Sequence, residues 1–436
     1  MPSSVTTQRQ ILLFWLPLAA SWLLMGLEGP VLQAAIARLA DVETQLAAFG
    51  IVMSLEIAIE SPVIMLLATS TALCTSARNY LTLRRFMIWI NVASTVVALL
   101  VAFTPLYDLI VRSLMSIPAD IADAAQPAMG IMTLWTAAIG VRRFYQGVMI
   151  RHGQTRFVGF GTGARLISSG GTGILLAVFA TLPGVRVGSI ALMAGVLTEA
   201  VFVALAVRPT VKRILSDARE PAAAVLSMGD VARYHSPLAA TSLLSLLAQP
   251  LIGAALARMP HPEENLAAWP VVWGILWIFR SPAFALPEAV IALISRRRLQ
   301  EAVRSFSLRI GAACTAAMVL VVATPLIDLY ISRVAGLPAS LSRYVLPATL
   351  LGVGLPFMNS IHSWLRGLLL AAHCTNTIYW GMGLNLVVTA VVVVGGVLLQ
   401  ARGAETAVIA LTAALVAEIY YLRKARGSAG AALPDV

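Results

Sequence analysis

Two pairs of polar residues have a spacing that suits the binding of an anion inside a membrane. Arg142 and Gln146 lie four positions apart, and so do His362 and Arg366. Residues four apart share one face of an α-helix, so each pair would present a polar, partly cationic edge. The two pairs are 220 positions apart, and Asn359 stands one turn before His362. Guanidinium groups in a low-dielectric cavity favour carboxylate or phosphate oxygens, which predicts an anion-binding site.

Arg280 extends this predicted substrate site to another segment. It stands 220 positions after Glu60, and equivalent positions of a repeat tend to face the same cleft. We therefore predict an ion pair between Glu60 and Arg280 that forms in one state and breaks in another, with a static buried pair as the alternative. For the other cations two alternatives stay open. They extend to the lipid headgroups, or they pair with acids; the residues concerned are Arg142, Arg143, Arg165 and Arg366 as cations and Glu199, Glu288 and Glu418 as acids.

Three acidic residues fall inside apolar segments and are candidates for gating or ion coupling. They are Glu28, Glu56 and Glu60. An ionised side chain at the centre of a bilayer is costly, so each needs a partner, an aqueous cavity or a coupling ion such as H⁺ or Na⁺. Glu28 lies two residues before Pro30, whose equivalent is Pro250. Because proline removes a backbone hydrogen bond, we expect helix kinks at both prolines.

The composition requires that these residues sit on membrane-spanning helices. The chain has 436 residues, of which 59% are hydrophobic and 12% charged, against about 45–50% and about 25% in soluble domains. Runs of about 20 apolar residues, long enough to cross a bilayer, recur throughout. We predict an all-α polytopic membrane protein with twelve spans, at about 11–38, 46–72, 86–110, 122–150, 157–180, 186–207, 232–258, 266–295, 305–331, 341–370, 377–400 and 404–424.

An internal duplication organises the twelve spans. Pro17-Leu18-Ala19-Ala20 returns as Pro237-Leu238-Ala239-Ala240, and Ser61-Pro62 returns as Ser281-Pro282, each 220 positions later. Six spans per repeat is an even number, so both repeats start on the same face and are parallel. Transporters built this way bind substrate between the halves, near mid-membrane. The predicted organisation is an N-lobe at 1–207, a linker at 208–231, a C-lobe at 232–424 and a tail at 425–436.

The formal net charge of +11 describes topology rather than a nucleic-acid partner. By the positive-inside rule, both termini and the linker are cytoplasmic, in the plasma or inner membrane. The expected partners are membrane lipids and a small anion, with no nucleic acid, and the expected state is a monomer. Basic residues on the cytoplasmic side include Arg84, Arg85, Arg151, Arg156, Arg296, Arg297, Arg298, Arg304 and Arg423.

Motifs of other function classes are missing from the sequence. There is no GxxxxGK[ST] loop, which argues against ATP as the energy source. There is no HExxH or GxSxG motif, and the three cysteines form no CxxC pair, so we expect no enzyme, no metal site and no cofactor. A membrane enzyme or a scaffold is the alternative class, but its polar residues would be concentrated, whereas these are dispersed symmetrically.

Twelve helices in two parallel six-helix repeats, with proline in the first and seventh, resemble the MATE-like fold of the multidrug, lipid-precursor and polysaccharide exporters. Within that superfamily the chain resembles the progressive ankylosis (ANK) family most. The similarity is in Phe14–Pro62, with the acidic Glu28 and the LAxxG…SL pattern from Leu46, in Gln146–His152 and in Leu286–Ala289.

This resemblance implies a secondary transporter that exports a small anion of the citrate, pyrophosphate or nucleotide kind by alternating access through a central cavity between the lobes. Two alternatives remain. One is an H⁺- or Na⁺-coupled exporter of cations or drugs of the MATE type, and the other is a flippase for lipid-linked precursors.

Overall fold

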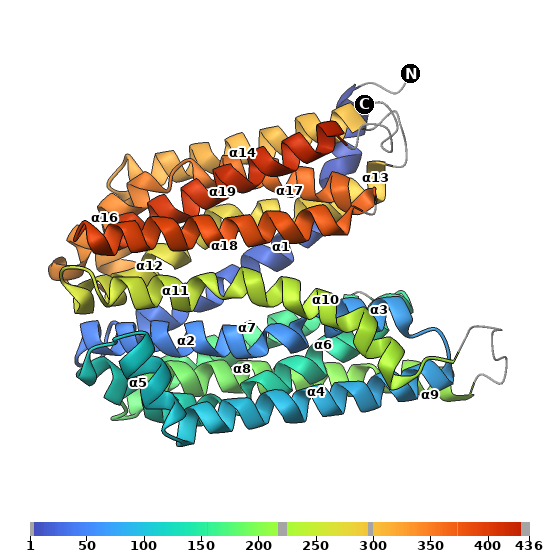
Figure 1. The fold of residues 1–436 in the computed structure, drawn as a ribbon, viewed down its shortest axis with the longest axis horizontal. Coiled ribbons are helices and arrows are strands. Elements are labelled where there is room, and N and C mark those ends of the chain that lie inside the picture. Colours follow the sequence, from blue (N-terminus) through green and yellow to red (C-terminus); the bar gives the residue numbers. More distant parts are fainter. Residues whose placement is uncertain (1–3, 155, 217–224, 295–299, 373, 429–436) are drawn as a thin grey trace. The chain divides into compact units, whose positions relative to one another are not determined.

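The computed structural model describes residues 4–154, 156–216, 225–294, 300–372 and 374–428, which form helices and short connections (Figure 1). The first repeat contains α1 (Ser4–Ile36), α2 (Val42–Ile64), α3 (Leu66–Leu73), α4 (Ala77–Phe103), the π-helical η1 (Asp108–Leu114), α5 (Ala119–Met132), α6 (Trp135–Arg151), α7 (Arg156–Phe179), α8 (Gly184–Ala206) and α9 (Arg208–Ser216).

The second repeat follows the same order. It contains α10 (Met228–Leu246), α11 (Ala248–Leu256), α12 (Pro262–Arg280), the 3-10 helix η2 (Ser281–Ala285), α13 (Leu286–Ile294), α14 (Gln300–Val322), α15 (Leu326–Leu329), the π-helical η4 (Tyr330–Val334), α16 (Ala339–Leu351), α17 (Leu355–Ala371), α18 (Thr375–Leu398) and α19 (Gly403–Ser428). Three stretches of the predicted topology lie outside the described residues, namely the linker centre at 217–224, the arginine run at 296–298 and the tail at 429–436.

The prediction of an all-α polytopic protein is confirmed. In the described part of the chain, ten helices or helix runs are long and apolar enough to cross a membrane, and two bent helix pairs bring the total to as many as twelve. The exposed faces of the helices are apolar, while Glu56, Glu199 and Arg142 are buried, which is the reverse of a soluble protein. This distribution is typical of a surface that contacts lipid.

Two of the predicted spans, at 122–150 and 341–370, are each formed by a bent pair of helices. The first bends by 43° between α5 and α6, and the second by 47° between α16 and α17. The breaks fall at Thr133–Leu134 and at Gly352–Gly354, so they occupy equivalent positions of the two repeats. Hydropathy reports how apolar a segment is but carries no information on its direction, so the bends left no signal in it.

The two predicted proline kinks differ in their local structure. α1 continues through Pro30 without a break in its helical assignment. In the second repeat the helix is interrupted at Leu247, between α10 and α11, three residues before Pro250. Proline has no N–H to donate to the carbonyl four residues earlier, which accounts for an interruption at that place. The bend at Pro30 stays a prediction.

Packing divides the chain into two compact units, and the first helix of each repeat packs in the unit of the other repeat. Unit 1 comprises Met1–Ala37 and Ala255–Val436, and unit 2 comprises Arg38–Ala254. In unit 1, α1 packs on α12 and η2; in unit 2, α10 packs on α2 and α4. This grouping differs from the lobes expected at 1–207 and 232–424 by the exchange of α1 for α10 and most of α11.

A pair of equivalent hydrogen bonds accompanies this exchange. In unit 1, Trp15 Nε1 donates to the carbonyl oxygen of Pro282 at 3.2 Å. In unit 2, His235 Nε2 lies 2.9 Å from the carbonyl oxygen of Pro62. Trp15 and His235 are 220 positions apart, and so are the two prolines. Because a carbonyl only accepts, His235 must donate from Nε2, which leaves Nδ1 to accept from Thr69 Oγ1 at 2.9 Å.

Helix starts are held in the same way in both units. Gln45 Oε1 accepts from the backbone N–H of Val185 at 3.1 Å, at the start of α8. Asn265 Oδ1 accepts from Ala404 N–H at 2.8 Å, at the start of α19. Each amide satisfies one of the N–H groups that a helix leaves unbonded in its first turn.

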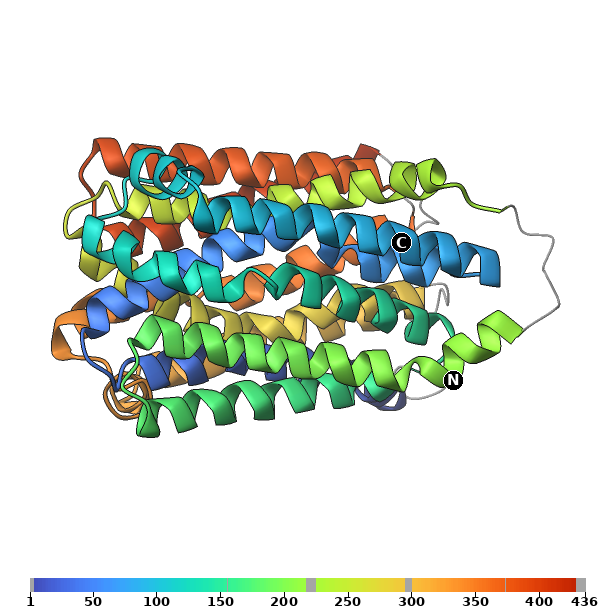
Figure 2. The ribbon, with the colours of Figure 1, turned by 90° about the horizontal axis from the view of Figure 1, so that it is seen from below.

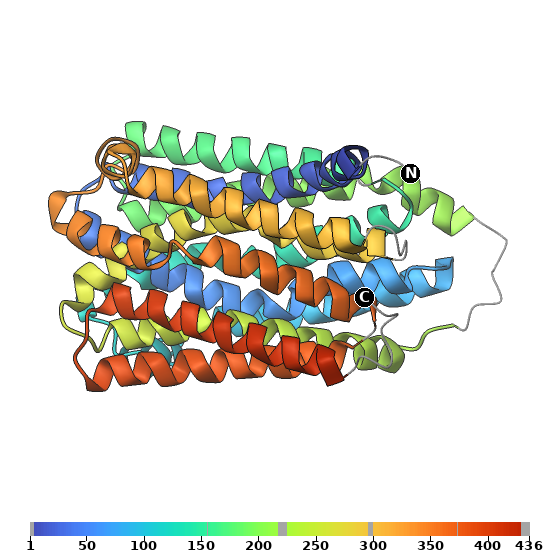
Figure 3. The ribbon, with the colours of Figure 1, turned by 90° about the horizontal axis from the view of Figure 1, so that it is seen from above.

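The last two spanning helices of each repeat form a hairpin beside the broken helix. In unit 2, α7 and α8 lie side by side (Figures 1 and 2). In unit 1, α18 and α19 do the same (Figures 1 and 3). α6 packs on α8, and α17 packs on α19. The broken helix of each unit therefore packs on the second helix of the hairpin in its own unit.

Candidate functional site

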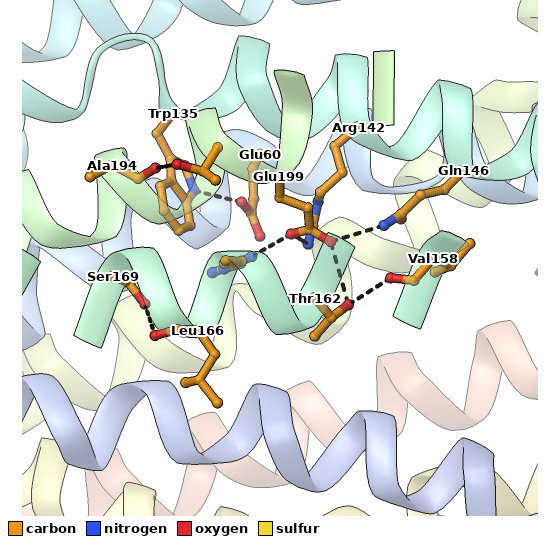
Figure 4. Close-up of polar contacts among 12 residues, drawn as sticks. Glu60, Trp135, Arg142, Gln146, Val158, Thr162, Leu166, Ser169, Ala194 and Glu199 are labelled. Atoms are coloured by element: carbon orange, nitrogen blue, oxygen red, sulfur yellow. Dashed lines mark hydrogen bonds and ion pairs between the residues drawn. The ribbon is translucent and has the colours of Figure 1, made fainter. Parts of the chain in front are cut away.

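In unit 2 the polar residues of three helices meet at Glu199 of α8 (Figure 4). Arg142 Nη1 of α6 lies 2.6 Å from Glu199 Oε2, and Gln146 Nε2 donates to Oε1 at 3.0 Å. Thr162 Oγ1 of α7 donates to the same Oε1 at 3.4 Å. The Glu199 side chain is 0% exposed and that of Arg142 is 3% exposed. A buried carboxylate is stable when opposite charge and hydrogen bonds replace its water, as they do here.

Arg165 of α7 connects this cluster to Glu60 of α2. Its Nη1 lies 3.8 Å from Glu199 Oε2, and its guanidinium stands 5.4 Å from the centre of the Trp135 ring. Trp135 Nε1 in turn donates to Glu60 Oε2 at 2.6 Å (Figure 4). Trp135 is the first residue of α6, directly after the bend, so the indole contact joins the break in the helix to the acid on α2.

Unit 1 repeats the arrangement with other residue types. Glu418 of α19 lies 2.8 Å from His362 Nε2 of α17 through Oε1. Its Oε2 accepts from Asn385 Nδ2 of α18 at 2.9 Å. His362 and Asn385 stand 220 positions after Arg142 and Arg165, and Glu418 follows Glu199 by 219. Duplication thus preserved a buried acid between the hairpin and the broken helix, while the cations changed.

Arg280 has a different environment. Its Nη2 donates to Asn359 Oδ1 of α17 at 3.3 Å, but Nε and Nη1 have no hydrogen-bond partner. Among the described residues, no carboxylate lies within ion-pair distance of this guanidinium. It is half-buried and stands 5.6 Å from the centre of the Trp273 ring and 5.9 Å from that of Phe284. Arg280 is therefore a desolvated cation whose charge the described protein leaves uncompensated.

Arg366 lies one turn beyond His362 on α17 and is also half-buried. Glu418 and Glu288 are the acids that interact electrostatically with Arg366. Within the described ranges, neither of them forms an ion pair with Arg366. Arg280, Asn359, His362 and Arg366 thus belong to one unit, and the last three share α17.

The acidic residues predicted to couple an ion differ in their surroundings. Glu56 of α2 is 0% exposed, and both its carboxylate oxygens have no hydrogen-bond partner in the described chain. Glu60, one turn further along α2, accepts a hydrogen bond from the indole N–H of Trp135. Glu28 is buried in α1 of unit 1. Thr136 Oγ1, next to Trp135, is another buried polar atom with no partner among the described residues.

These contacts show which of the predicted residues meet one another and which have other partners. Arg142 and Gln146 meet at Glu199, and Arg280 meets Asn359. For Arg142 and Arg165, the alternative of pairing with a membrane acid describes what is observed. Glu60 accepts a hydrogen bond from Trp135, and Arg280 donates one to Asn359. The ion pair between Glu60 and Arg280 stays a prediction.

From the sequence, Glu199 and Glu418 were expected only as pairing partners, although each is the centre of its cluster. Trp135 was not among the predicted residues. A buried tryptophan needs an acceptor for its indole N–H, and an acid two spans earlier in the same repeat was the signal that could have found it.

The three tryptophans of α12 belong to the packing around Arg280. Trp269 and Trp273 have ring centres 6.0 Å apart, and Trp273 and Trp277 have theirs 5.7 Å apart. Trp277 lies so close to Gly26 of α1 that a Cβ there would approach its ring to 2.6 Å. In the part of the chain that the structure describes, no three His, Cys, Asp or Glu residues gather as metal ligands would.

Comparison with known proteins places the fold. No protein-family model matches the sequence, and no curated protein matches it. The fold is that of the MATE transporters of the MOP superfamily. A multidrug resistance MATE family transporter in an inward-facing conformation superposes with a TM-score of 0.65 at 14% identity, covering 93% of this chain and 96% of that one.

Two further solved structures share the fold over nearly their whole length. A MOP superfamily transporter from Pyrococcus furiosus, described as having a binding pocket of reverse polarity, gives a TM-score of 0.67 at 13% identity and covers 96% of this chain and 95% of its own. The eukaryotic MATE transporter AtDTX14 gives 0.62 at 14% identity, with 97% and 96% covered. At these identities the likeness shows the fold alone, and the narrower resemblance to the ANK family stays a prediction.

Proposed function

We propose that this protein is a secondary transporter that exports a small anionic solute by alternating access between the two sides of a cell membrane. The substrate class is a di- or tricarboxylate, pyrophosphate or a nucleotide-like anion. The fold shared with MATE transporters supports the transport mechanism. The single observation that carries the substrate charge is Arg280, a half-buried guanidinium in which two nitrogens, Nε and Nη1, have no acceptor among the described residues.

The contacts divide the predicted cationic residues into two roles. Arg142 is neutralised by Glu199, so its contribution is to hold α6 against the hairpin. Arg280 and Arg366 have no paired carboxylate among the described residues, so an entering anion would gain their charge without first breaking an ion pair. Asn359 and His362 would complete the site with hydrogen bonds. An unpaired, desolvated arginine gains hydrogen bonds and an opposite charge when a carboxylate or phosphate binds its guanidinium.

Coupling to an ion would use the acids of the first repeat. A carboxyl buried without a partner, as Glu56 is, is stable when neutral or when it holds a cation. Uptake of H⁺ or Na⁺ at Glu56, with Glu60 and Glu28 as gates, would link the cargo to a gradient. The solved structure described as having a binding pocket of reverse polarity is a precedent for a pocket of different polarity within this fold.

The same acids favour a second candidate, an H⁺- or Na⁺-coupled exporter of cations or drugs. In that case Glu28, Glu56 and Glu60 would bind the transported cation, and Arg280 would have a structural role only. The two candidates predict opposite signs of transported charge, so one set of flux measurements separates them.

The test is solute flux in proteoliposomes with Arg280→Ala and Arg280→Lys. For an anion exporter, the apparent affinity for labelled citrate or pyrophosphate should fall about thirtyfold in Arg280→Ala, since loss of a desolvated charge contact costs about 2 kcal/mol or more. Arg280→Lys should retain part of it. The matched control is Arg112→Gln, which removes a partly exposed arginine that pairs with Asp108 and Asp123 outside the long helices.

Three outcomes decide between the candidates. Loss of anion flux in Arg280→Ala, with melting temperature and control unchanged, supports the anion exporter. Unchanged anion flux in Arg280→Ala and in Arg366→Ala would refute it. Flux of a cationic dye that disappears in Glu56→Gln and persists in Arg280→Ala would establish the second candidate instead.

A further inference from the structure

A cavity on the surface of unit 1 has no place in the proposed transport site. It measures about 460 Å³ and follows one face of α14, where Phe357 of α17 closes it. α14 and α17 lie side by side (Figures 1 and 3). Its lining residues combine charge at one end of the helix with apolar groups, and they are Glu301, Arg304, Ser305, Leu308, Arg309, Ala312 and Phe357.

The arrangement of the two arginines is that of a clamp. At about 100° per residue, Ser305, Leu308 and Ala312 form the floor of the groove, and Arg304 and Arg309 stand on its opposite flanks. Five residues of helix separate them by about 7.5 Å along the axis. The Arg304 guanidinium lies 5.7 Å from the centre of the Trp364 ring, which holds it towards α17. Within the described ranges, neither arginine forms an ion pair.

The first repeat provides an internal comparison, because the equivalent face of α4 carries different residues. Leu81, Trp89 and Val92 occupy the positions of Glu301, Arg309 and Ala312. All three are exposed, Trp89 to 69%, so they place large apolar side chains where α14 has a charged or small residue. Arg84 is retained at the position of Arg304, and Arg85 stands at the position of Ser305. The groove of α14 therefore arises from specific differences between the repeats and is not a general property of the fold.

The residues beyond the clamp indicate what the groove holds. Further along α14, the exposed side chains are apolar and include Val319 and Leu320. A ligand that fits this face has an anionic head for Arg304 and Arg309 and an apolar tail for Leu308, Phe357 and the exposed stripe. Near the end of a membrane-spanning helix, that combination of groups is found in a phospholipid.

We propose that the α14 groove binds an anionic glycerophospholipid, with its phosphate between Arg304 and Arg309 and an acyl chain along the apolar side of α14. A free phosphate could bind the same two arginines, but it has no apolar part to contact Leu308, Phe357 and the exposed apolar side chains of α14. The proposal depends on the protein spanning a membrane and is independent of what it transports.

Native mass spectrometry of the full-length protein in detergent tests this, with phosphatidylglycerol and phosphatidylcholine titrated separately. We expect phosphatidylglycerol to be retained more strongly. Arg304→Ala should weaken its apparent Kd about fivefold, the equivalent of about 1 kcal/mol per basic residue at a membrane surface. The double variant R309W/A312V, which installs the residues of α4, should abolish the specific adduct. Arg84→Ala, the equivalent change in the first repeat, should have no effect.

Two results would overturn the proposal. Equal retention of phosphatidylglycerol by the wild type, by R309W/A312V and by Arg304→Ala would show that the groove is not the site. Displacement of the lipid by glycerol 3-phosphate or inorganic phosphate at equal concentration would show a site for free phosphate. Because Arg304→Ala changes one exposed side chain, the melting temperature of this variant should match that of the wild type. The single variant therefore keeps the test valid if the double variant fails to fold.

Discussion

At the scale of single residues, the two buried acids differ in what their partners can do. Glu199 faces Arg142 and Arg165, which stay charged under all ordinary conditions. Glu418 faces His362, whose imidazole, unlike a guanidinium, has a stable neutral form. The same position in two repeats is therefore an acid paired with arginines in unit 2 and an acid paired with an imidazole in unit 1.

Glu199→Gln should consequently be more destabilising than Glu418→Gln. The first change leaves Arg142 buried without a counter-charge, and removal of one partner of a buried pair costs about 3–5 kcal/mol. The second leaves a histidine that can become neutral, so its cost should be smaller. Thermal unfolding of both variants in detergent measures the difference. The double variant E199Q/R142Q should recover part of the loss, and equal melting temperatures for the two single variants would contradict this reading.

At the scale of elements, close helix crossings hold the broken helices in place. A Cβ at Gly147 of α6 would meet the Leu67 carbonyl oxygen of α3 at 2.5 Å, besides the side chain of Ser70. At the equivalent Gly367 of α17, it would meet Val290 at 2.7 Å. Both crossings place the polar edge of the helix at a depth that a larger residue would change. Small residues at helix contacts are the usual means of such close approach in membranes.

Gly147→Val should therefore lower both stability and transport. Overpacking of a close-packed contact costs about 1–3 kcal/mol, and α6 would have to move away from α3. Gly159→Ala in α7 is the matched control, because a Cβ there has no atom within 4 Å. Melting temperature and flux, measured on both variants, test this. A Gly147→Val protein with wild-type stability would show that the crossing is looser than the structure indicates.

At the scale of the whole molecule, the gene duplication and the packing do not coincide. The duplication divides the chain near the linker, whereas packing joins α1 to the helices of the second repeat. Trp15, in the first repeat, donates a hydrogen bond to Pro282 and packs edge-on against Phe306, with ring centres 5.5 Å apart. Both of these partners belong to the second repeat, beyond the linker. The exchange of first helices makes each unit depend on both halves of the chain.

A protein divided in the linker tests this dependence. Expressed together, fragments 1–220 and 221–436 should copurify as a stable complex, because each supplies a helix that the other buries. Expressed alone, each fragment should aggregate or be degraded, since α1 and α10 would expose the faces that Trp15 and His235 occupy. Size-exclusion chromatography and limited proteolysis give the result. Either fragment behaving alone as a monodisperse, protease-resistant protein would contradict the grouping.

Features that are local or periodic along the chain can be predicted from the amino-acid sequence. Hydropathy over about 20 residues predicts a spanning helix from its own composition. The offset of 220 positions predicts two equivalent sets of helices and identifies Arg142 with His362 and Gln146 with Arg366. Four-residue spacing places each pair on one helix face.

What those helix faces contact depends on how the helices pack. The bends at Thr133–Leu134 and Gly352–Gly354, the indole of Trp135 on Glu60, and the packing of α1 in unit 1 left no periodic trace in the sequence. The same holds for the difference between Arg142, which is neutralised, and Arg280, which is not. A charge is compensated by whichever residue lies within a few ångströms in space, and pairs separated by 57 positions, as Arg142 and Glu199 are, meet only when the helices between them have packed.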